Sequence, residues 1–127
     1  MKTIVQNYEI SATIDQVWEA LVSPSKIEEW GGGPSVEMQA TKGSEFKLWG
    51  GDIYGTNTKV EAPKLLEQDW NTDGFDKPSK VTFALSAKNG VTHLLLTHSN
   101  VPDDREQDIS EGWKEYYLGP MKQLLEA

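Results

Sequence analysis

The sequence predicts an α+β domain in which a curved antiparallel sheet packs against one long C-terminal helix. Between Asp104 and Glu126 the large apolar residues recur at helical spacing, and charged residues occupy the other face. Between residues 35 and 99 apolar and polar residues instead alternate in short runs separated by turn residues, which is typical of an antiparallel meander. Because a wide apolar helix face needs a broad apolar partner, sheet and helix are expected to share one core.

Length and charge limit the possible classes of protein. The chain of 127 residues is expected to form a single domain, residues 1–127. It contains no apolar run long enough to span a membrane and no signal-peptide pattern, so the cytoplasm is the expected location. A net charge of −8 argues against nucleic acid or an anionic membrane as partner, because both would repel the chain. With no cysteine, disulfides and thiolate metal sites are excluded.

The N-terminal third predicts one strand followed by two short helices. Residues 3–10 alternate as a strand, and Thr13 with Gln16 forms a capping-box pattern at the start of the first helix. Pro24 suits the first turn of a second helix that ends at the glycines of residues 31–33. These glycines follow a helix rather than lead into one, so they are interpreted as a hinge or cavity mouth and not as a phosphate loop.

The middle of the chain predicts the rest of a sheet of about six to seven strands. The expected further strands are residues 36–40, 45–49, 53–61, 65–70, 81–85 and 92–99. Lys88, Asn89 and Gly90 are typical of a hairpin turn. The strand at residues 53–61 is polar for its length, and one alternative is a bulge near Thr58 and Lys59 that turns Asn57 outward.

The final helix is expected to begin near Asp103, with an Asp cap and Glu106 three residues later as a capping box. Its apolar face is expected to comprise Ile109, Trp113, Tyr116, Tyr117, Met121, Leu124 and Leu125. Pro120 has no amide proton for the carbonyl of Tyr116, which predicts a kink between these two residues. A kinked helix lies less flush on a sheet, so a cavity between them is expected.

Several segments together carry a family resemblance. They are residues 10–21 (ISATIDQVWEAL), Trp30 after a Ser-Pro helix start, Gly43 with Phe46, Gly55, residues 63–70, residues 96–102 (LTHSNVP) and residues 112–117 (GWKEYY). In this order they resemble the START-like or SRPBCC superfamily, and more narrowly the family of activator of heat-shock protein 90 ATPase homologues. The resemblance implies the helix-grip fold, in which a curved sheet wraps around the C-terminal helix.

The resemblance also implies three classes of function. Most proteins of this superfamily hold a hydrophobic ligand between sheet and helix, so the leading hypothesis is non-catalytic binding of a small hydrophobic or aromatic molecule, in a stress response. The namesake family implies the alternative, a co-chaperone-like module that stimulates a heat-shock protein 90 type ATPase. An enzyme of cyclase or hydrolase type is the third hypothesis. No cofactor is expected, and the sequence does not indicate an oligomeric state.

The candidate ligand-binding residues are those expected to face the space between sheet and helix. They are Trp30, Phe46, Leu48, Asn57, Gln68, Trp70, Phe83, His98, Trp113, Tyr117 and Met121. The polar members Asn57, Gln68 and His98 interrupt apolar rows, and burying them without partners is costly. They either bond one another inside the protein, or Asn57 turns outward at the bulge, or the three hold polar atoms of a ligand.

No residue is assigned a catalytic or metal-binding role. As a general base His98 would need a carboxylate to orient it, and no acidic residue shares its expected face. His93 is expected to point away from the cavity, so the two histidines make no metal site.

Overall fold

Six antiparallel strands and a long broken helix make up the structure, a computed structural model that describes residues 1–127. The strands are β1 (Lys2–Ile10), β2 (Glu45–Leu48), β3 (Ile53–Glu61), β4 (Leu65–Thr72), β5 (Ser79–Lys88) and β6 (Val91–Val101). The helices are α1 (Ile14–Val22), α2 (Pro24–Trp30), α3 (Glu106–Gly112) and α4 (Leu118–Glu126), with 3₁₀ turns η1 (Trp49–Gly51) and η2 (Asp103–Arg105) and a π-helical turn η3 (Trp113–Tyr117). None of the helices has the length and apolar character needed to cross a membrane.

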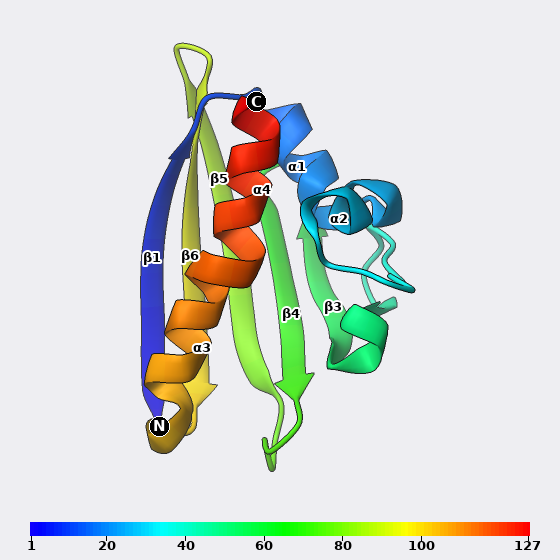
Figure 1. Cartoon of the computed structure of the whole chain (residues 1–127), viewed down its shortest axis with the longest axis vertical. Helices are drawn as coiled ribbons and strands as arrows, with labels where there is room; N and C mark the ends of the chain where they lie inside the picture. The colour runs from blue at the N-terminus through cyan, green and yellow to red at the C-terminus, as the bar shows by residue number, and fades with distance from the viewer.

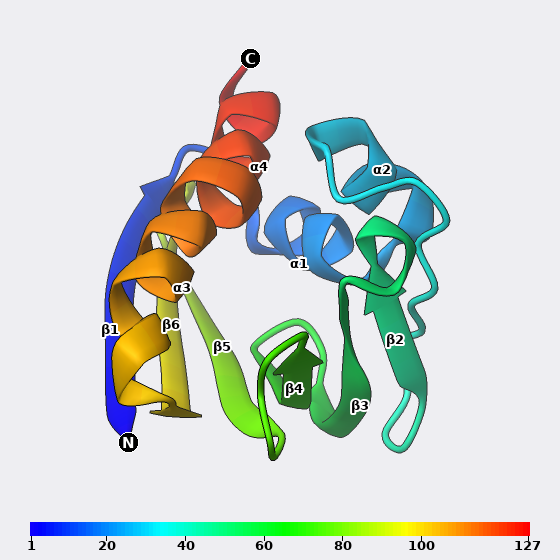
Figure 2. The same cartoon turned by 60° about the horizontal axis from the view of Figure 1, so that its bottom comes forward.

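The sheet runs in the order β1-β6-β5-β4-β3-β2, so the first strand pairs with the last. Figure 1 shows the C-terminal helix lying across one face of this sheet. In Figure 2 the sheet curves from β1 to β2, with α1 and the C-terminal helix on its concave side. α1 and α2 carry the chain from one sheet edge to the other. The predicted fold class, an α+β helix-grip arrangement, is confirmed.

Local sequence signals account for several boundaries. The Thr13 hydroxyl accepts from the Gln16 amide at 3.2 Å and the Gln16 side chain accepts from the Thr13 amide at 2.9 Å, so the predicted capping box is formed. Asn89 and Gly90 both have positive φ (54° and 79°), as a two-residue hairpin turn between β5 and β6 requires. The predicted bulge is present as a register shift between Asn57 and Lys59.

The predicted strand at residues 36–40 is wrong. Only Glu37 pairs with the sheet, through a single bridge to Lys47. Beyond it the chain leaves the sheet edge because its backbone serves another partner: the carbonyl of Gln39 accepts from Nδ2 of buried Asn57 at 2.9 Å. The segment therefore packs beside the middle of β3, at Asn57, instead of extending the sheet next to β2.

The predicted capping box at Asp103 is also wrong. Residues 103–105 form the 3₁₀ turn η2, and α3 begins only at Glu106, without a side-chain cap. The carboxylate of Asp103 instead lies 2.9 Å from the N-terminal amino group of Met1, and both partners are exposed. This contact lowers the pKa of Asp103.

The predicted break in the last helix exists, and it takes the form of a π-helical turn. Because of this turn, the apolar face of the helix differs from the expected one at two residues. In this turn the Leu118 amide donates to the carbonyl of Trp113, five residues back. Leu118 is therefore fully buried, although it was not expected on the apolar face. Tyr116, which was expected there, is 65% exposed.

The backbone of the π-helical turn leaves no room for a side chain at Gly119. A Cβ atom at Gly119 would lie 2.0 Å from the backbone carbonyl oxygen of Lys114, so any side chain must distort the helix. We expect Gly119→Ala to lower the free energy of unfolding by about 1 to 3 kcal/mol, as other overpacked sites do. The measurement is urea unfolding followed by far-UV circular dichroism.

Gly112 provides the matched control in the same helix. A Cβ atom there meets no atom within 4 Å, and its φ and ψ of −61° and −40° suit any residue. Gly112→Ala should therefore be neutral or stabilise by up to about 1 kcal/mol through helix propensity. Equal effects at Gly112 and Gly119 would contradict the close backbone approach at Gly119.

Candidate functional site

A cavity of about 310 Å³ lies between the C-terminal helix and the ends of β3 and β4. Its lining comes from η1, β3, β4, α3 and the π-helical turn: Trp49, Asp52, Ile53, Trp70, Thr72, Asp108, Ile109, Gly112, Trp113, Tyr116 and Tyr117. The turn η1 is held in place from the loop after α2. Trp49 donates from its indole nitrogen to the carbonyl of Gly31 at 2.8 Å and from its amide to Gly32, also at 2.8 Å.

Four rings in contact form one side of this cavity, and we call them the aromatic wall: Trp49, Trp70, Trp113 and Tyr117. The Trp113 ring lies 5.6 Å from Trp70 and 4.7 Å from Tyr117, measured between ring centroids. Trp49 meets Tyr117 edge to face at 6.0 Å. Rings packed in this way offer a small molecule a rigid, largely apolar surface.

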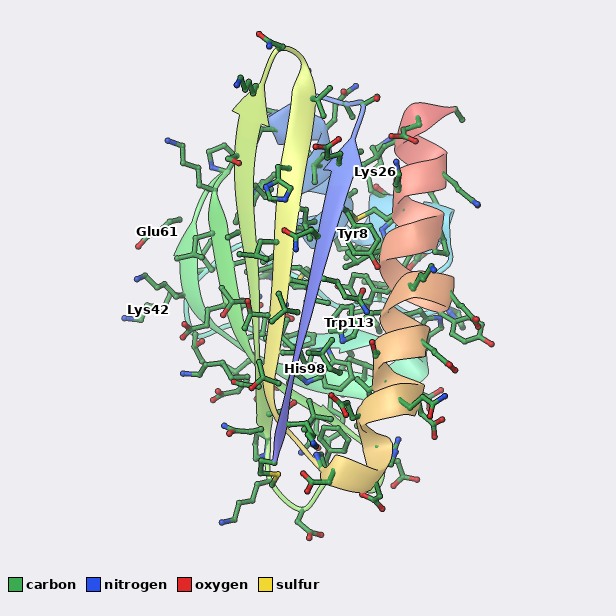
Figure 3. All side chains as sticks on the ribbon, turned by 90° about the vertical axis from the view of Figure 1, so that its left-hand side faces the viewer. Tyr8, Lys26, Lys42, Glu61, His98 and Trp113 are labelled. Atoms are coloured by element: carbon green, nitrogen blue, oxygen red, sulfur yellow. The ribbon has the colours of Figure 1, made fainter.

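Behind the wall, His98 joins the helix to the sheet through its two ring nitrogens. Its Nδ1 accepts from Nε1 of Trp113 at 3.0 Å, so the ring proton sits on Nε2, which lies 2.7 Å from Ser79 Oγ. The Ser79 hydroxyl in turn donates to the carbonyl of Trp70 at 2.8 Å. Figure 3 shows Trp113 reaching toward the sheet and His98 toward the helix.

This arrangement determines the charge of His98. The side chain is fully buried, and burial lowers its pKa to about 3, so the imidazole is neutral at physiological pH. Both ring nitrogens are already engaged within the protein. In this state His98 braces the Trp113 helix against β6 and is not free to move a proton.

Asn57 and Gln68 form a second internal network. Nε2 of Gln68 donates to Oδ1 of Asn57 at 3.0 Å, while Nδ2 of Asn57 bonds the carbonyl of Gln39. Asn57 stays fully buried despite the bulge, so it is not turned outward. Of the three alternatives given for the buried polar residues, Asn57 therefore follows the first, an internal hydrogen-bond network.

Two buried polar atoms have no hydrogen-bond partner: Oε1 of Gln68 and Nε1 of Trp70. The amide orientation of Gln68 is fixed, because its Nε2 must face the Asn57 oxygen. An unpartnered buried donor or acceptor costs about 1 to 3 kcal/mol, so each of these atoms is a local cost to the stability of the fold. Trp70 is also part of the aromatic wall.

The remaining candidate residues lie at different distances from the cavity. Trp70, Trp113 and Tyr117 line it, whereas the others do not. Those behind the wall are buried in the core or in the polar networks: Trp30, Phe46, Leu48, Asn57, Gln68, Phe83, His98 and Met121. Trp30 and Phe83 support the wall from behind, with centroids 4.7 and 6.0 Å from Tyr117.

Sequence reasoning did not assign several lining residues to the site. They are Trp49, Asp52, Ile53, Thr72, Asp108, Ile109, Gly112 and Tyr116. Most belong to turns, strand ends or the helix margin. At such positions the alternation of apolar and polar residues does not predict which way a side chain points. The one available signal was Trp49 directly before two glycines, a large ring placed on a tight turn.

Comparison with known sequences adds two similarities, one to a family model and one to a curated relative. The family model described as Activator of Hsp90 ATPase homolog 1-like protein matches residues 11–126. The "Activator of 90 kDa heat shock protein ATPase homolog" of Dictyostelium discoideum is 28% identical over 85 residues, which are 64% of this chain and 22% of that protein. The chain spans about a quarter of the length of the curated relatives it matches.

Solved structures share the fold closely. An HSP90 activator from Plasmodium falciparum superposes with a TM-score of 0.90 at 21% identity, covering 98% of this chain and 96% of that one. CalU16 from Micromonospora echinospora superposes with a TM-score of 0.80 at 26% identity, covering 94% of this chain and 74% of that one. Because its sequence identity is only 21%, the similarity to the Plasmodium falciparum structure shows a shared fold alone.

Proposed function

Because this chain belongs to the family of Activator of Hsp90 ATPase homolog 1-like proteins, we propose that it is a non-catalytic binding domain for a small hydrophobic or aromatic molecule. The observation that carries the proposal is the cavity of about 310 Å³ beside the aromatic wall. Its size falls within the range of small-molecule sites, about 300 to 1,000 Å³.

The state of His98 argues for binding rather than acid–base catalysis. A general base must be able to take a proton near neutral pH, and a pKa of about 3 with both nitrogens engaged does not allow it. The cyclase or hydrolase hypothesis therefore gains no support from His98. The site supports holding a molecule more directly than transforming it.

Gly112 allows a direct test of the cavity as a ligand site. It lines the cavity, and a Cβ atom there meets no neighbour within 4 Å. We expect a screen of small aromatic compounds to raise the melting temperature of the wild type, since a ligand at 100 times its Kd adds about 2.7 kcal/mol. Gly112→Leu should fold but lose this response, while Gly112→Ala should retain most of it.

Tryptophan fluorescence gives an independent readout, because Trp49, Trp70 and Trp113 all lie in the aromatic wall. Binding compounds should shift or quench emission in the wild type and not in Gly112→Leu. A response that survives in Gly112→Leu would locate binding elsewhere. No response to any compound would end the ligand-binding proposal.

A co-chaperone-like protein interaction is the second candidate, favoured by the family and by the names of the curated relatives. It is a proposal for this chain, which corresponds to about a quarter of those relatives. The test is the ATPase rate of a purified heat-shock protein 90 type chaperone with and without this protein. Stimulation that persists in Gly112→Leu would separate this role from cavity occupancy.

A further inference from the structure

The cavity carries negative charge that nothing in the protein neutralises. Asp52 and Asp108 line it from two different elements: Asp52 follows η1, and Asp108 lies on α3. No Lys, Arg or His is among the lining residues, and neither carboxylate takes part in an ion pair. The net charge of the chain, −8, adds to the negative potential at this opening.

The backbone around Asp52 is held firmly. Its amide donates to the carbonyl of Trp49 at 3.3 Å, and its own carbonyl accepts from the Thr72 hydroxyl at 2.7 Å. Both partners belong to the cavity lining. The carboxylate is therefore presented beside the aromatic wall from a fixed main chain, which reduces the entropy lost when a ligand binds.

Aromatic faces and carboxylates attract the same kind of ligand group. The faces of tryptophan and tyrosine carry partial negative charge and attract cations within about 6 Å of the ring centroid. Rings of the aromatic wall are grouped closely enough to act together, with Trp113 5.6 Å from Trp70 and 4.7 Å from Tyr117. Tyr116, exposed on the helix, adds a fifth ring to the lining. An anion in this cavity would meet two carboxylates and no cationic side chain.

We propose that the ligand of this cavity is an organic cation, an ammonium group attached to an aromatic or alkyl body. The proposal rests on the function proposed above and specifies its ligand class. The body packs on the aromatic wall, and the ammonium group lies toward Asp52 and Asp108. Neutral molecules of the same shape bind more weakly.

Three probes of similar size separate charge from shape: phenyltrimethylammonium, its neutral isostere tert-butylbenzene, and the anion benzenesulfonate. Affinities are measured by titration of tryptophan fluorescence and by calorimetry. We expect the cation to bind about tenfold or more tightly than the neutral isostere, which is the scale of one to two cation–π contacts. The anion should bind most weakly.

Variants assign the preference to the two carboxylates. In Asp52→Asn/Asp108→Asn the ratio of cation to neutral affinity should fall several-fold, because the ammonium group loses both carboxylates while the aromatic wall remains. Glu9→Gln/Glu19→Gln removes the same charge from exposed residues that do not line the cavity, and should keep the ratio. This control separates local contact from the field of the whole chain.

The outcomes distinguish the two proposals. If tert-butylbenzene or benzenesulfonate binds as tightly as phenyltrimethylammonium, the cation inference is overturned and the ligand-binding function stands. A ratio of cation to neutral affinity that is unchanged in Asp52→Asn/Asp108→Asn also overturns the inference. If none of the three probes binds but the compound screen gives a response, the cation inference alone fails. If the screen is silent as well, both proposals fail.

Discussion

Replacing Trp113 by alanine is expected to lower the free energy of unfolding by about 3 to 5 kcal/mol, the range for truncating a buried tryptophan. Trp113 is 3% exposed and packs between Trp70 and Tyr117, so the substitution removes the centre of the aromatic wall. It also removes the only donor to Nδ1 of His98, which is itself fully buried. Urea unfolding measures the loss.

Two further variants separate the causes. Trp113→Phe keeps a ring but not the donor, so its cost should include the penalty of about 1 to 3 kcal/mol for an orphaned acceptor. Tyr116→Ala is the control on the same helix, because Tyr116 is 65% exposed and should change stability by no more than about 0.5 kcal/mol. A large effect at Tyr116 would mean that the helix is regular and that the π-helical turn is absent.

The position of Tyr116 also shows how far the sequence can predict this helix. Pro120 identifies a break, because it cannot donate to the carbonyl of Tyr116. It does not identify the form of that break. One extra residue in a turn rotates the following face by about 100°, which buries Leu118 and exposes Tyr116. Such a rotation depends on packing against the sheet and on the close backbone approach at Gly119.

Elements with local signals could be predicted, whereas those fixed by distant partners could not. The capping box at Thr13 and the turn at Asn89 and Gly90 need only neighbouring residues. The departure of residues 39–44 from the sheet edge depends on hydrogen bonds to Asn57, more than ten residues later. Alternation therefore suggested a strand where tertiary contacts favour a loop.

The residues of the candidate site also differ in how well the sequence predicts their positions. Alternation correctly placed Asn57, Gln68 and His98 on the inner face of the sheet. It could not place Trp49, because the strand ends at Leu48 and positive φ at Trp49 redirects the ring. The cavity consequently lies nearer the start of β3 and the end of β4 than an analysis of strand faces alone would suggest.

Acidification is the second change with a large expected effect, and His98 is its cause. Burial lowers the pKa of His98 from 6.5 to about 3 in the folded protein, so the unfolded chain takes up a proton that the folded protein does not. The free energy of unfolding should therefore fall as the pH drops below 6.5, by about 1.4 kcal/mol per pH unit. Between pH 6.5 and pH 4 the loss is about 3 kcal/mol.

His98→Gln isolates this contribution, because glutamine can still accept from Trp113 and donate to Ser79 without titrating. The variant is expected to be less stable than the wild type at pH 7 and to lose less stability on acidification, so the two unfolding curves converge toward pH 4. Asp103 and Glu126, whose pKa values are also lowered, respond equally in both proteins and cancel in the difference. An NMR titration of His98 with a pKa near 6.5, or parallel curves for the two proteins, would show that the imidazole is hydrated and that it does not brace Trp113 against β6.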